Sequence, residues 1–102
     1  MRLYGTVQFG QREGVLGGRA MFGVRCEPHV SMKLKQVFPK ISPQQGLITI
    51  AVTEDSARDL EWFLERYPMQ VSPEALAAMS TGARAYDRRR QHTQAVMLGQ
   101  VP

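Results

Sequence analysis

Cysteine and histidine are scarce in this sequence, which limits the chemistry open to it. Cys26 is the only cysteine in 102 residues, so no internal disulfide can form, and a reducing compartment suits the chain. His29 and His92 lie far apart in sequence, and with one cysteine they do not make a zinc-binding constellation. We therefore expect neither a disulfide framework nor a bound metal.

Long apolar runs are also missing. No run approaches the roughly 20 apolar residues that a membrane span requires. The first residues, Met1 to Thr6, lack the apolar stretch of a secretory signal. We expect a soluble cytoplasmic protein, in the host cytosol if a phage encodes it, with no membrane contact.

Motifs for catalysis are absent as well. The glycine-rich residues 10–18 are not followed by Gly-Lys-Ser or Gly-Lys-Thr, so they predict a hairpin connection and not a P-loop. The serines have no recognisable base and orienting partner. The carboxylates of residues 55–65 have helical spacing and predict a solvated face shared with Arg58 and Arg66. We predict that the chain is not an enzyme, has no catalytic residues and takes no cofactor.

Size and composition predict one small domain over residues 1–102. Hydrophobic residues make up 43% of the chain and charged residues 22%, as in globular domains. A chain of this length can bury one modest core. We expect a strand–helix–strand unit in residues 1–52 and a helical part in residues 53–102.

Hydrophobic periodicity changes along the first half. Alternating apolar residues predict strands over residues 2–9, with Tyr4 on the polar side, and over 20–26. Pro28 suits a first helical turn, and the apolar spacing that follows predicts a helix over residues 28–38. Val30, Met32 and Leu34 also alternate, which leaves a strand open as the second interpretation. Residues 42–46 predict a turn and residues 47–52 a short strand.

The second half carries helix start signals. Thr53 is a good N-cap, and the apolar stripe that follows predicts a helix over residues 54–66. We expect Trp62, next to this stripe, to be at least partly buried; stacking on a ligand is the alternative. Ser72, Pro73 and Glu74 predict the start of a further helix. Gly82 either ends it or lets residues 83–98 continue as a last helix.

Together these elements predict an α+β fold. The sheet is small, antiparallel or mixed, with about three strands, and it packs with three or four helices. The C-terminal half is helical.

Three runs of residues resemble a known family: MKLKQVFP at 32–39, ITI at 48–50 and ARDLEWFLERYP at 57–68. They make residues 24–68, and more loosely the chain to residue 98, similar to the N-terminal accessory region of Swi/Snf-type helicases of phages and bacteria. Within this region the strand–helix–strand unit resembles the HepA-related protein (HARP) module of annealing helicases. The resemblance implies binding to branched or single-to-double-stranded DNA. Where that module usually has aromatic residues, Leu47, Ile48 and Ile50 stand here.

Basic residues are the candidate binding site. The formal net charge of +4 and the pI of about 9.7 favour polyanionic partners. The candidates come from the segment with the family resemblance and from a run near the last helix: Arg25, His29, Lys33, Lys35, Lys40, Arg88, Arg89 and Arg90. Three consecutive residues sweep most of a helix circumference, so the three arginines cannot all contact one surface.

We predict a non-catalytic DNA-binding accessory module of a Swi/Snf-like helicase that contacts DNA backbone and shape. The alternative is a small phage-type protein–protein interaction module, or an inhibitor of a nucleic-acid-processing complex, that uses the acidic helix at 55–65 or the methionine-containing tail. No helicase motor follows residue 102. We expect the chain to be either a module excised from a longer protein or a free-standing small protein. Its expected protein partner is a helicase motor or another nucleic-acid-processing protein.

Overall fold

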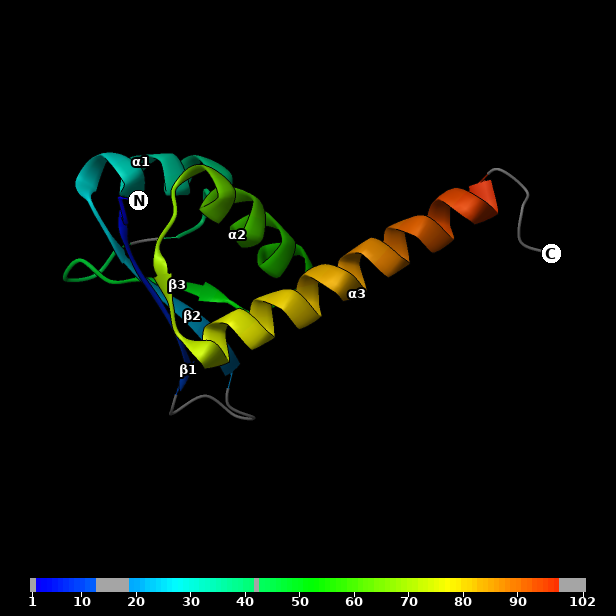
Figure 1. The fold of residues 1–102 in the computed structure, drawn as a ribbon, viewed down its shortest axis with the longest axis horizontal. Helices are drawn as coiled ribbons and strands as arrows, with labels where there is room; N and C mark the ends of the chain where they lie inside the picture. Colours follow the sequence, from blue (N-terminus) through cyan, green and yellow to red (C-terminus); the bar gives the residue numbers. More distant parts are fainter. Residues whose placement is uncertain (1, 13–18, 42, 98–102) are drawn as a thin grey trace.

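The computed structural model describes residues 2–12, 19–41 and 43–97 and has the predicted α+β class (Figure 1). In chain order the described elements are β1 (Gly5–Arg12), β2 (Arg19–Cys26), α1 (Pro28–Val37), β3 (Ile48–Ala51), α2 (Glu54–Arg66), β4 (Gln70–Val71) and α3 (Pro73–Met97). The helix predicted over residues 54–66 is confirmed residue for residue. Of the hairpin connection predicted at residues 10–18, residues 10–12 belong to β1 and residues 13–18 lie outside the described residues, as do residue 42 of the predicted turn and residue 98.

The sheet is mixed, with strand order β3-β2-β1-β4. β2 pairs antiparallel with both β1 and β3, so Val24 stands between Val7 and Ile48. β4 pairs parallel with β1 and was missed by the sequence analysis, because two residues show no periodicity. It is held by tertiary contacts, since Ser72 N–H donates to the Val7 carbonyl at 2.9 Å.

The core lies on one face of the sheet. Alternate strand residues, among them Val7, Phe22 and Ile48, are buried in one cluster with residues from all three helices. The opposite face carries exposed residues such as Gln8 and Thr49. A hollow of about 700 Å³ lies over this open face.

The first two helices begin and end at recognisable signals. α1 is a helix and not the alternative strand: it starts at Pro28, and Phe38 N–H closes its last turn on the Leu34 carbonyl at 2.9 Å. At the start of α2, the Thr53 and Ser56 side chains each accept a 2.9 Å hydrogen bond from the other residue's backbone N–H. This reciprocal pair satisfies two backbone donors at the helix start.

Gly82 does not break the last helix, because α3 runs unbroken through it. Ser72 caps α3, with its Oγ accepting from Ala75 N–H at 3.2 Å. A Cβ atom at position 82 would lie 2.6 Å from the Ala57 Cβ. Glycine is therefore needed here for the close approach of α3 to α2.

Only the first part of α3 packs against the body of the protein. Ala75, Met79 and Ala83 are buried, whereas residues 87–94 are exposed. Figure 1 shows the second half projecting away from the sheet and the other helices. Among the described helices, none combines the length and the apolar character needed to cross a membrane.

Tyr4 differs from its predicted position on the polar side of a strand. It precedes β1 and is half-buried, and its ring meets the Tyr67 ring edge-on with centroids 5.6 Å apart. Its backbone N–H donates to the Pro68 carbonyl at 2.9 Å. This bond ties the N-terminal segment to the end of α2 and turns the ring inward.

We expect Gly82→Ala to lower the free energy of unfolding by about 1 kcal/mol, because the methyl group overpacks the α2–α3 contact. An unhindered helical site would gain about 1 kcal/mol from the same change. Urea unfolding measures the effect. The double variant A57G/G82A should be more stable than the sum of the two single effects predicts, because A57G makes room for the added methyl group. A G82A protein as stable as the wild type would contradict the close packing of Gly82 on Ala57.

Candidate nucleic-acid interface

The structure distributes the predicted DNA-contacting residues over three surfaces. Arg25 is on the open face of the sheet, because it alternates with buried Val24, and its Nη1 donates to the Gln45 carbonyl at 3.3 Å. Lys40 lines the hollow over this same face. α1 packs on the opposite face of the sheet. The strand and its following helix therefore do not present their cations together.

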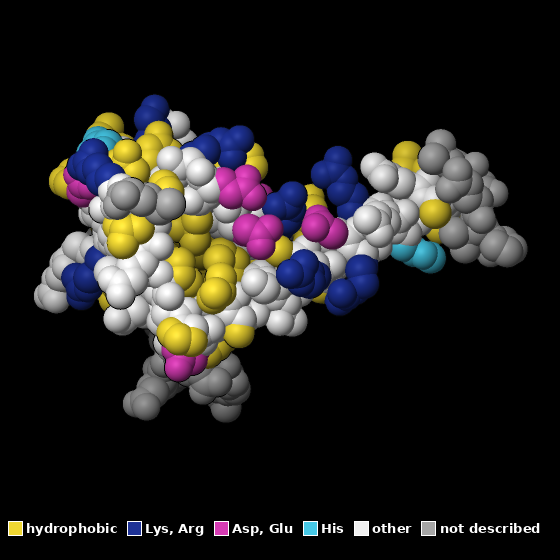
Figure 2. Space-filling model, viewed as in Figure 1, with side chains coloured by type: hydrophobic (Ala, Val, Ile, Leu, Met, Phe, Trp, Pro, Cys, Tyr) yellow, Lys and Arg dark blue, Asp and Glu magenta, His cyan; other side chains and the backbone are white. Residues whose placement is uncertain are grey.

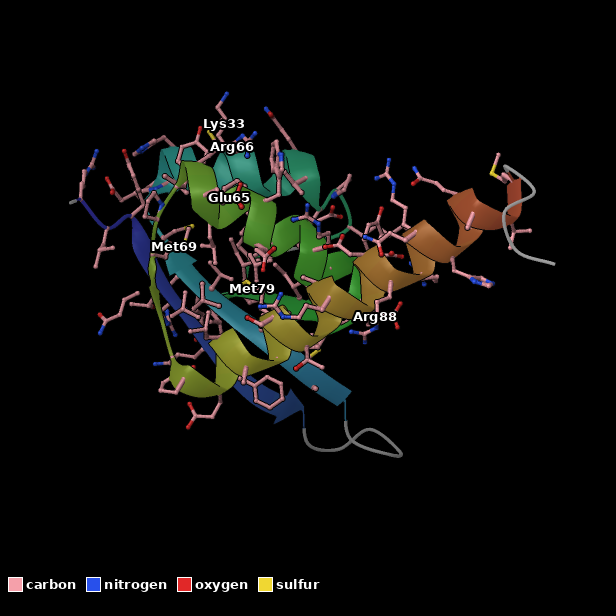
Figure 3. All side chains as sticks on the ribbon, turned by 45° about the vertical axis from the view of Figure 1, so that its right-hand side comes forward. Lys33, Glu65, Arg66, Met69, Met79 and Arg88 are labelled. Carbon is pink, nitrogen blue, oxygen red and sulfur yellow. The ribbon has the colours of Figure 1, made fainter. Side chains whose placement is uncertain are left out.

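On α1, His29, Lys33 and Lys35 are exposed. His29 lies against the Tyr4 ring, with centroids 6.2 Å apart. The two lysines are about 200° apart around the helix, so they point to different sides. Figure 3 shows Lys33 of α1 and Arg66 of α2 at the outer edge of the helical layer.

The three consecutive arginines of α3 point in three directions, as their helical spacing predicts. Arg89 faces the start of α2 and pairs with Glu54 and Asp55 at 3.1 and 2.8 Å. Arg90 lines a small hollow between the helices. Arg88 lies on the side of α3 away from α2 (Figure 3).

A hollow of about 430 Å³ lies where the three helices meet, lined by Val37, Arg58, Asp59, Trp62, Tyr86 and Arg90. The Trp62 ring is partly covered by the Arg66 guanidinium, 3.7 Å from its centroid. At 42% exposure Trp62 is not a core residue; its neighbour Phe63, at 1%, takes that place. One step along a helix turns a side chain by about 100°, which separates the two aromatic residues.

Ionised groups crowd the rim of this hollow. Arg58 pairs with Glu61 of its own helix and with Asp87 of α3, both at 3.2 Å. Partial burial raises the pKa of the Asp59 carboxyl above its ordinary value, and repulsion from Asp55 adds to the rise, while Arg58 opposes it. The hollow therefore favours the neutral form of Asp59.

Among the described residues, ion pairs neutralise a larger share of the negative than of the positive side chains. They involve five of the eight described carboxylates but only three of the eleven described Lys and Arg side chains. Arg84, Arg88 and Arg90, which we call the α3 arginine cluster, are exposed and have no ion pair with a described residue. Figure 2 shows several Lys and Arg side chains around the middle of α3, with acidic side chains among them.

Arg84 is the member of this cluster that sequence reasoning missed. Its spacing of four residues from Arg88 was the available signal, because residues four apart share one side of a helix. Asp87 is the sole carboxylate in residues 84–97, and Arg58 already neutralises it. The middle of α3 therefore presents positive charge, and across the small hollow Asp59 is a carboxylate without an ion pair among the described residues.

No family model, curated protein or solved structure matches this chain. The similarity to helicase accessory regions therefore stays a prediction, and the functional argument depends on the geometry described above.

Truncating the two neighbouring aromatic residues should separate core from surface. We expect Phe63→Ala to cost about 3–5 kcal/mol of unfolding free energy, as buried aromatic truncations do. Trp62→Ala should cost about 1 kcal/mol, mainly from its contact with Arg66. Chemical denaturation of both variants measures the difference, and equal losses would place Trp62 in the core after all.

Asp59→Asn should raise the melting temperature at pH 7. Because the pKa of Asp59 is raised in the folded state, ionising this carboxyl lowers the free energy of unfolding. This loss of stability is present above the folded-state pKa and disappears as the pH falls and the carboxyl protonates. The advantage of the variant should therefore shrink toward about pH 3. Thermal unfolding at several pH values tests this, with E65Q as a control for losing a negative charge on the same helix. An advantage independent of pH would contradict it.

Proposed function

We propose that this chain is a non-catalytic DNA-binding module that contacts phosphates through the middle of α3. The observation that carries the proposal is the α3 arginine cluster: three exposed arginines without ion pairs among the described residues, in the middle of α3 where it passes the start of α2. Arginine binds phosphate with a planar fork of N–H donors. The formal net charge of +4 acts in the same direction.

The shape of α3 suits a DNA groove. The major groove of B-DNA is about 12 Å wide and admits an α-helix. Arg88 and Arg90 lie about 200° apart around α3, so a helix in the groove can direct them to phosphates on both walls. Such contacts position the protein without reading sequence. We therefore expect binding that depends strongly on salt and weakly on base sequence.

The resemblance of residues 24–68 to helicase accessory regions supports DNA as the polyanion. A module of this kind would work in the cytoplasm beside a helicase motor or another nucleic-acid-processing protein. Lys33, at the outer edge of α1, and Lys40, on the open face, lie away from the α3 arginine cluster and would add long-range attraction.

One observation favours the alternative, a protein–protein interaction module. Val96 and Met97, near the end of α3, are 51% and 80% exposed. Exposed apolar residues at the end of a projecting helix suit a protein contact. This function would leave the α3 arginine cluster without a role in binding DNA.

Neutralising the α3 arginine cluster should weaken DNA binding. We expect R84Q/R88Q/R90Q to lower the affinity for every duplex sequence tested and to reduce the salt slope by about one unit per lost phosphate contact. Fluorescence anisotropy with labelled duplexes across a salt series measures both quantities.

The matched control is K33Q/K35Q/K40Q, which removes the same charge from α1 and the segment after it. It should weaken binding much less. Equal losses in the two triple variants would show that overall charge, and not α3, determines affinity. A folded wild-type chain that binds no DNA at low salt would overturn the DNA proposal in favour of the protein partner.

A further inference from the structure

We propose that Arg89 is a further DNA-contacting residue that Glu54 and Asp55 keep masked, so that these two carboxylates act as an internal mimic of phosphate. The inference rests on the proposed function and concerns the regulation of the same site. Its basis is the pair of contacts between the middle of α3 and the first turn of α2.

Both branches of the Arg89 guanidinium are occupied. Nη1 lies 3.1 Å from Glu54 Oε2, and Nη2 lies 2.8 Å from Asp55 Oδ1. Carboxylates and phosphates accept hydrogen bonds from the same N–H fork of arginine. The two acids and a DNA phosphate therefore compete for the same donors.

Arg89 is placed where a phosphate bound to α3 would reach it. It stands between Arg88 and Arg90 in the chain, at the point where α3 leaves α2. The two carboxylates place two negative charges at this point, and Figure 2 shows acidic side chains beside the basic ones there. They occupy Arg89 and also repel an approaching phosphate.

The masking contact can be exchanged. The Arg89 side chain is 56% exposed, and its partners Glu54 and Asp55 are 44% and 68% exposed. Ion pairs this exposed are weak and are screened by salt. In the wild type the two carboxylates therefore compete with DNA phosphates for Arg89, and Arg89 contributes little to binding until the carboxylates are removed.

The capping hydrogen bonds and the close helix packing near this contact do not involve the side chains of the two carboxylates. The start of α2 keeps its reciprocal Thr53–Ser56 hydrogen bonds, both 2.9 Å long. α3 remains held by the close packing of Gly82 on Ala57. Neutral side chains of the same shape at positions 54 and 55 should leave both features in place.

The experiment compares duplex DNA binding by wild type, E54Q/D55N, R89Q and E54Q/D55N/R89Q in a fluorescence anisotropy salt series. E54Q/D55N should bind roughly tenfold tighter at low salt and steepen the salt slope by about one unit, because one more arginine meets phosphate. R89Q alone should change affinity little. Added to E54Q/D55N, R89Q should remove most of the gain, and the part that remains is the lost repulsion between the two carboxylates and phosphate.

The matched control is E65Q/E74Q, which neutralises two exposed carboxylates that have no ion pair among the described residues. A gain equal to that of E54Q/D55N would overturn the masking of Arg89 and leave only a general charge effect. A gain that survives R89Q undiminished would overturn it too. Circular dichroism checks folding, and if the double variant unfolds, E54Q and D55N singly should each give part of the gain. Absence of wild-type binding would instead remove the proposed function.

Discussion

The close approach of α3 to α2 at Gly82 is the constraint on which the arrangement of the helices depends. With no side chain at position 82, the backbone of α3 comes against Ala57, a contact that an added Cβ would make 2.6 Å long. This contact sets the line along which α3 leaves the body, and so decides which arginines reach α2. Arg89 then meets the acidic first turn of α2, and Arg58 meets Asp87. The members of the α3 arginine cluster remain without an ion pair to α2 in this arrangement.

Local signals predicted most of the fold, and tertiary contacts decided the rest. Proline, caps and apolar period placed α1 and α2, because each signal acts within a few residues of its helix. β4 and the unbroken course of α3 through Gly82 depend on β1 and on Ala57, which are distant in sequence. Propensity describes glycine as a weak helix former, and only packing shows why it is tolerated inside α3.

The candidate site was less predictable than the fold. Charge predicted the residue types, and helical geometry predicted that Arg88, Arg89 and Arg90 diverge. Strand alternation could have placed Arg25 opposite the helices, because Val24 beside it is strongly apolar. The pairing of Arg89 with Glu54 and Asp55 joins residues 34 and 35 positions apart, so no local pattern shows it. The sequence therefore does not distinguish an arginine that is paired with carboxylates from one that is free.

The acidic first turn of α2 therefore has two physical roles. Glu54 and Asp55 stabilise the positive end of the α2 dipole, which any helix favours. They also neutralise Arg89, which depends on where α3 crosses. An arginine that stays paired with carboxylates neutralises no phosphate and so releases no counterions from DNA. The salt slope of binding then reports the number of arginines without carboxylate partners, which is smaller than the number of arginines on the surface. Charge composition alone therefore overstates the electrostatic contribution of such a surface to DNA binding.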